Sequence, residues 1–170
     1  MLSVENSLEI LIFSDSHGDH FRMRRVIEAH PKATHVLFCG DGLADIAHLE
    51  KDFPMRVFIS VKGNCDGWLS SLEELDERIF LLGGLRIFMT HGHTYGVKGG
   101  YGVAATHAAG AQADVLLFGH THIPYEGRLT ANDRCIHLFN PGSIGARGNE
   151  ASYGVLTIME NGYLFSHGQA

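Results

Sequence analysis

The chain has 170 residues, a length that suits one domain with a full hydrophobic core, so a single domain over residues 1–170 is predicted. Apolar residues make up 45% of the sequence and charged residues 19%, values that exclude a disordered chain. The formal net charge of −6 excludes the basic surplus that binds nucleic-acid backbones or anionic membranes.

The N-terminal part of the chain alternates short apolar runs with segments of helical periodicity. Helices are predicted over Asp19–His30 and Leu43–Lys51. Buried strands, each followed by a polar turn, are predicted over Leu8–Phe13, His35–Cys39 and Arg56–Val61. This alternation favours a largely parallel sheet with helices outside it.

The C-terminal part is richer in strands. Ile79–Leu82 and Leu85–Met89 flank Gly83-Gly84, which is a hairpin signal, and an Ala-rich helix is predicted over Gly102–Gln112. Further strands are predicted over Val115–Phe118, Cys135–Phe139, Tyr153–Met159 and Tyr163–Ser166. So many strands in a short chain predict two sheets packed face to face, with helices on the outer faces.

Polar side chains follow five of the predicted strands at the point where each strand ends. Each alone has an ordinary explanation, such as a helix N-cap for Asp15 or a turn residue for Asn64. Ligands bind outside the carboxyl ends of strands in open parallel sheets, so five such ends favour a shared site. The sequence therefore predicts a metal site with the donors Asp15, His17, Asp41, Asn64, His91, His120 and His122.

These segments resemble, in order, the motif set of the calcineurin-like metallophosphoesterases, and especially that of the small YfcE-like phosphodiesterases of bacteria and archaea. The resemblance runs from about Leu8 to past Ser143. It implies an α/β fold, a four-layer αββα sandwich of two mixed sheets with a dinuclear metal site at its rim. It rests on Asp15-Ser-His17, Gly40-Asp41, Gly63-Asn64-Cys65-Asp66, His91-Gly92-His93 and Gly119-His120-Thr121-His122.

The resemblance also implies a role for each donor. One metal would be held by Asp15, His17, Asp41 and His122, and the other by Asp41, Asn64, His91 and His120, so Asp41 is the bridge. Carboxylate and imidazole donors suit manganese, which we expect, and also iron, zinc, nickel and cobalt. Two divalent ions stay net positive beside two aspartates, which explains how an acidic protein attracts a phosphate ester.

The implied activity is hydrolysis of a phosphodiester by in-line attack of a hydroxide that bridges two divalent metals. A phosphomonoesterase or nucleotide phosphatase is the alternative enzyme. A non-catalytic scaffold, like the eukaryotic retromer subunit of the same fold, is the alternative from another class. That subunit lacks a full set of metal-binding histidines, so the four histidines retained here favour the enzyme.

The proton donor to the leaving group is less defined. Many members of the family have histidine after the motif asparagine, whereas this chain has Cys65, as the YfcE-like group does. The Cys65 thiol is one candidate, and His93 and Asp66 are alternative donors or supports of the metal ligands. The turn Asn140-Pro-Gly-Ser143 is predicted to shape the rim of the site.

The spacing of the cysteines and the hydropathy of the sequence favour a cytoplasmic location. Cys39, Cys65 and Cys135 are widely spaced and form no CxxC pair, which favours a reducing interior. We expect a cytoplasmic protein without a signal peptide or membrane span, because no apolar run is long enough. The expected partner is a small phosphorylated substrate, without specific nucleic-acid binding, and relatives often form homodimers or tetramers.

Overall fold

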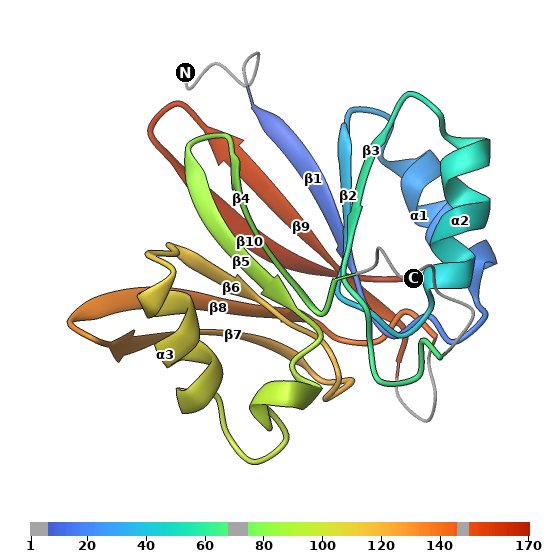
Figure 1. Cartoon of the computed structure of the whole chain (residues 1–170). Helices are drawn as coiled ribbons and strands as arrows, with labels where there is room; N and C mark the ends of the chain where they lie inside the picture. Colours follow the sequence, from blue (N-terminus) through green and yellow to red (C-terminus); the bar gives the residue numbers. More distant parts are fainter. Residues whose placement is uncertain (1–6, 68–74, 146–149) are drawn as a thin grey trace.

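The computed structural model describes residues 7–67, 75–145 and 150–170, which form two mixed five-stranded sheets (Figure 1). The first sheet has the order β10-β9-β1-β2-β3. Its strands β1, β2 and β3 are parallel, and β9 runs antiparallel to both β1 and β10. The bounds are β1 (Leu8–Phe13), β2 (His35–Phe38), β3 (Val57–Ser60), β9 (Ser152–Met159) and β10 (Gly162–Gln169).

The second sheet has the order β4-β5-β6-β8-β7. Strands β5, β6 and β8 are parallel, and the two edge strands run antiparallel to their neighbours. The bounds are β4 (Glu77–Leu82), β5 (Leu85–Thr90), β6 (Val115–Leu117), β7 (Pro124–Ala131) and β8 (Arg134–Pro141).

Helices cover the outer face of each sheet, which confirms the predicted four-layer sandwich (Figure 1). Helices α1 (His20–Ala29) and α2 (Leu43–Asp52) pack on the first sheet, and α3 (Gly102–Gly110) packs on the second. The core between the sheets is built from fully buried side chains of both, among them Ile12, Leu37 and Met89. No described helix combines the length and the apolar character that crossing a bilayer requires.

The helix α1 illustrates how local sequence produces these elements. The Asp19 side chain caps the helix by accepting a hydrogen bond from the Arg22 amide at 3.2 Å. Met23, Val26 and Ile27 follow at helical spacing and are buried against the first sheet. One apolar stripe and a capped start therefore fix both the position and the orientation of the helix.

Strand β7 has no counterpart among the apolar runs of the sequence. Its residues alternate between exposed and half-buried, and the half-buried ones include Gly127 and Ala131. It is an edge strand held by antiparallel pairing along the whole of β8. Such a polar edge strand lacks the apolar signal by which buried strands are predicted.

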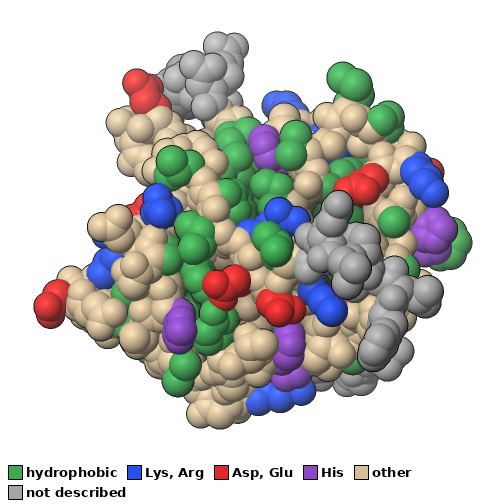
Figure 2. Space-filling view, in the orientation of Figure 1, with side chains coloured by type: hydrophobic (Ala, Val, Ile, Leu, Met, Phe, Trp, Pro, Cys, Tyr) green, Lys and Arg blue, Asp and Glu red, His purple; other side chains and the backbone are tan. Residues whose placement is uncertain are grey.

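Figure 2 shows acidic and basic side chains interspersed over the face drawn in Figure 1.

Candidate metal centre

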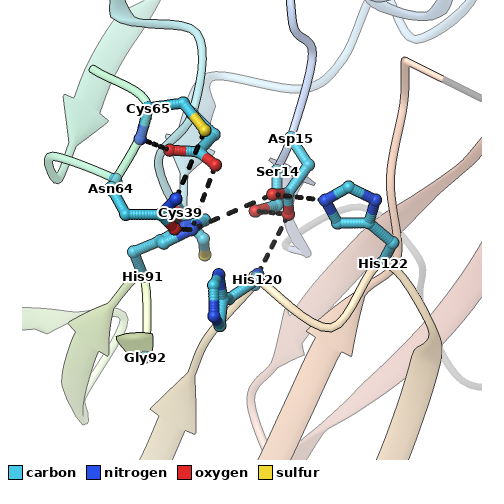
Figure 3. A network of polar contacts seen from close by, with 12 residues as sticks. Ser14, Asp15, Cys39, Asn64, Cys65, His91, Gly92, His120 and His122 are labelled. Carbon is cyan, nitrogen blue, oxygen red and sulfur yellow. Dashed lines mark hydrogen bonds and ion pairs between the residues drawn. The ribbon is translucent and has the colours of Figure 1, made fainter. Parts of the chain in front are cut away.

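The loops that carry the predicted donors follow strands of both sheets and meet at one rim of the sandwich. Figure 3 shows Asp15, Asn64, His91 and His122 around a common centre, with His120 beside them. The loops after β1, β2 and β3 belong to the first sheet, and those after β5 and β6 belong to the second. The site therefore lies where the two sheets meet.

One group of donors surrounds the Asp15 carboxylate. The Nε2 atom of His122 lies 3.1 Å from Asp15 Oδ1, and Nε2 of His17 lies 3.8 Å from the same oxygen. The two imidazole nitrogens are 3.4 Å apart. Donor atoms of these three residues all lie within 4.8 Å of one another, which suits a single cation.

A second group surrounds the ring of His91. Its Nε2 atom lies 3.3 Å from Asp41 Oδ2, 3.0 Å from Asn64 Oδ1 and 3.9 Å from Asp15 Oδ1. Asp41 also belongs to a donor group with His17 and Cys65. Asp41 thus has a close donor from each group, His17 of the first and His91 of the second.

His120 is adjacent to the second group but belongs to none of the close donor groups found among the described residues. Its ring lies 5.0 Å from that of His91, centre to centre. Its backbone amide donates a hydrogen bond to Asp15 Oδ2 at 3.1 Å. The backbone of His120 therefore orients Asp15, while its ring stands at the edge of the centre.

Two observations fit a cation at this centre. Asp15 Oδ1 is buried and accepts no hydrogen bond, a state shared among the described buried side chains only by Nδ1 of His93. A buried carboxylate oxygen without a hydrogen bond is costly unless a cation satisfies it. Nδ1 of His91 donates to the Cys39 carbonyl at 2.7 Å, so the lone pair of Nε2 faces the centre.

The electrostatics of the centre keep Asp41 ionised and His120 neutral, and they favour a proton on His91 that a cation would displace. Burial acts to raise the pKa of Asp41, but the hydrogen bond and charge of His91 and the Cys65 amide outweigh it and hold that pKa well below its usual range. Burial acts to lower the pKa of His91, but Asp41 and Asp15 raise it above its ordinary value. Burial, and then the charge of His91, lower the pKa of His120 to about 4, so this ring is neutral near pH 7.

The backbone of the centre is strained. Eight described residues other than glycine have φ between 46° and 65°, and five of them are predicted ligands: Asp15, His17, Asp41, His120 and His122. Such conformations cost about 1–3 kcal/mol each and persist where the surrounding structure enforces them, commonly at functional sites. Gly63 is needed nearby, because a Cβ there would lie 2.1 Å from Asp41 Oδ1.

Asp66 stands behind the ligands. Its two carboxylate oxygens accept four backbone N–H groups at 2.8–2.9 Å, those of Asp41, Gly42, Leu43 and Gly63. These bonds join the loop after β2 to the loop after β3. The contacts suit a residue that positions Asp41, and they occupy the oxygens that a proton donor would use.

The predicted rim turn at Asn140 has a similar supporting role. The Asn140 side chain donates to the Gly119 carbonyl at 2.9 Å and to Thr121 Oγ1 at 3.0 Å. The Ser143 hydroxyl donates to the Asp15 carbonyl at 2.9 Å. The turn therefore fixes one ligand loop from each sheet.

Sequence patterns did not single out Asp45 of α2. This carboxylate is buried, and its Oδ2 atom accepts the Ser16 hydroxyl at 2.5 Å and the Gly18 amide at 2.9 Å. It thus holds the residues on both sides of His17. An acidic residue in the first turn of a helix is common for electrostatic reasons alone, so the sequence carries no specific signal for this contact.

The candidate proton donors Cys65 and His93 flank the centre. Cys65 is exposed, and its amide donates to Asp41 Oδ1 at 2.7 Å. Partial desolvation of the thiol, and then the hydrogen bond and charge of Asp41, raise the pKa of Cys65. The His93 ring lies 5.4 Å from that of His91, and burial lowers its pKa. Both side chains border the donors, so geometry leaves both as candidates.

Comparisons with known proteins agree with these motifs. Residues 8–161 match the calcineurin-like phosphoesterase superfamily domain. The chain is 31% identical over 159 residues to the probable metallophosphoesterase YsnB of Bacillus subtilis, with 89% of this chain and 85% of that protein covered. It is 32% identical to the phosphodiesterase YfcE of Escherichia coli, with 88% of this chain and 87% of that protein covered.

A solved structure of a differently named protein, Vps29, has the same fold. The chain matches zinc-complexed Vps29 of Entamoeba histolytica with a TM-score of 0.68 and 17% identity, over 95% of this chain and 99% of that one. This likeness concerns the fold alone. The family match and the two sequence relatives confirm the resemblance that the ordered motifs predict. The chain belongs to the calcineurin-like phosphoesterase superfamily.

Proposed function

We propose that this protein is a phosphodiesterase that holds two divalent ions at the rim and hydrolyses small phosphodiesters. The observation that carries the proposal is Asp15 Oδ1, a buried oxygen without a hydrogen bond that faces the Nε2 atoms of His122 and His91. The names of the relatives YsnB and YfcE, a probable metallophosphoesterase and a phosphodiesterase, support the class of reaction.

The donors divide into two sets around Asp41. Asp15, His17 and His122 would hold one ion and Asn64, His91 and His120 the other, and the mixture of carboxylate and imidazole suits manganese, iron, zinc, nickel or cobalt. We propose manganese. When bound, the ions would supply an acidified bridging hydroxide as nucleophile and positive charge for the phosphate oxygens.

The residues of the chain prepare this reaction by fixing charge and orientation. Asp41 is held ionised by His91 and by the Cys65 amide, and Asp66 fixes its backbone. The Cys39 carbonyl orients the ring of His91. We assign the proton for the leaving oxygen to either Cys65 or His93, since both border the centre, and we assign Asp66 to positioning.

Metal analysis combined with two substrates tests the proposal. Manganese-loaded protein is expected to hydrolyse bis(p-nitrophenyl) phosphate faster than p-nitrophenyl phosphate. The opposite order would indicate the phosphomonoesterase alternative. Absence of turnover in protein that holds two ions would support the alternative of a non-catalytic scaffold.

Because an exposed thiol follows Asn64 and Asp66 is occupied by amides, protonation of the leaving oxygen is expected to be weak. The rate on a series of aryl methyl phosphates should therefore rise steeply as the pKa of the leaving phenol falls. Single-turnover rates measure this dependence, and a flat series would contradict the prediction.

Asp45→Ala removes the acceptor for Ser16 and Gly18 and should weaken the binding of one of the two ions by about 10- to 100-fold. Asp45→Asn keeps an acceptor oxygen and should retain most of the affinity. Metal content after dialysis and the absorption spectrum of the cobalt form measure the effect without reference to activity.

Asp19→Ala is the matched control for Asp45→Ala. Asp19 lies in the loop between β1 and α1 that Asp45 contacts, and it caps α1, so its loss should cost about 1 kcal/mol of stability. It makes no described contact with a predicted ligand side chain. Equal metal loss in both alanine variants would show that Asp45 acts only through general stability.

A further inference from the structure

A pocket of about 700 Å³ opens on the same rim as the metal centre. The described part of its wall comes from the starts of β7 and β9 and the end of β10. These strand ends contribute Pro124, Ser152 and Gln169. Apart from His122, the described residues that line the pocket are not proposed metal ligands.

The pocket is continuous with the metal centre through one side chain. His122 lines the pocket, and its Nε2 atom lies 3.1 Å from Asp15 Oδ1. An ester whose phosphate contacts the centre would therefore place a substituent next to the pocket. A volume of this size is within the range of small-ligand sites, which is about 300–1,000 Å³.

The pocket wall combines apolar surface with a rigid support. Ile123 follows His122 directly and is 61% exposed, although it is a large apolar residue. His167 donates from Nε2 to the Asn140 carbonyl at 2.8 Å and stacks on Phe139 with 4.4 Å between ring centres. Covering an exposed isoleucine beside a preformed wall favours binding of an apolar group.

The charge of the pocket selects against an anionic occupant. Its described lining contains the carboxylate of Glu150, which accepts a hydrogen bond from Gln169 at 2.6 Å, and no lysine or arginine. A second phosphate or a carboxylate would be repelled there. A neutral ring carries no such penalty and buries the surface of Ile123.

We propose that this pocket binds the neutral, ring-bearing organic group of the ester whose phosphate lies at the metal centre. The proposal rests on the proposed function and extends it to a substrate class: phosphoesters with an aryl-like or similarly sized uncharged ring group. Ile123 and Pro124 supply the apolar wall, and the carboxylate of Glu150 disfavours an anionic occupant.

Direct binding of two phosphonates tests the proposal. Phenylphosphonate and methylphosphonate present the same anionic head to the metals and differ only in the organic group. Calorimetry with the manganese-loaded protein should show phenylphosphonate binding about tenfold more tightly, and Ile123→Ala should reduce this ratio to about threefold or less. Because Ile123 is exposed, the substitution is not expected to disturb folding.

Val103→Ala is the matched control, because Val103 on α3 is 58% exposed and does not line the pocket. It should leave the ratio unchanged. Equal affinity of the wild type for the two phosphonates, or an equal effect of both substitutions, would overturn the pocket proposal. Failure of both phosphonates to bind metal-loaded protein would instead contradict the proposed function.

Discussion

Replacing Asp41 with alanine is expected to lower the rate of bis(p-nitrophenyl) phosphate hydrolysis by about a thousandfold. Asp41 lies in a donor group with His91 and in another with His17, so its loss affects both metal positions. The substitution also removes the negative charge that raises the pKa of His91. The variant should retain less than one metal per chain, measured by elemental analysis after dialysis.

The matched control for this prediction is Asp133→Ala. Asp133 also has a positive φ, 58° against 65° for Asp41, but it is exposed in the turn between β7 and β8. Any cost of placing alanine in the left-handed region is therefore shared by the two variants. Asp133→Ala should keep wild-type activity and metal content, and full activity in Asp41→Ala would rule out the centre as proposed.

Phe139→Ala is expected to reduce the free energy of unfolding by about 3–5 kcal/mol. Phe139 is fully buried between the sheets, where it stacks on Phe165 with 4.4 Å between ring centres. Removing the ring leaves a cavity in a core to which both sheets contribute. Urea unfolding in the presence of a chelator measures the loss without a contribution from bound metal.

Phe21→Ala is the control for this loss, because Phe21 on α1 is 67% exposed. Its removal should change the free energy of unfolding by no more than about 1 kcal/mol. A comparable loss in the two variants would mean that burial between the sheets does not determine the stability of the sandwich.

The fold was predictable where burial leaves a continuous apolar run. Strand β1, for example, coincides with the predicted Leu8–Phe13, and its last four residues are fully buried. Strand β7 was missed because only one of its faces is half-buried and small residues occupy part of that face. Apolar runs report burial on both faces of a strand, and the alternating sequence of β7 contains no such run.

The candidate site was predictable because each donor directly follows an apolar strand. Parallel strands bring such positions to one rim, so the order of motifs predicts which residues gather there. Asp45 and the pocket beside His122 were not predictable in this way. Their contacts join segments far apart in sequence, as when Asp45 of α2 accepts the Ser16 hydroxyl, and no periodicity records such a pairing.

The origin of the donors in two different sheets has a mechanical consequence. Asp15 and His17 extend from the first sheet and His122 from the second, while Asn64 and His91 are divided in the same way. A cation held by either set would cross-link the loops of the two sheets at this rim. Loss of the ions would then destabilise this rim of the sandwich first. Catalytic activity and the local stability of the rim would therefore be lost together.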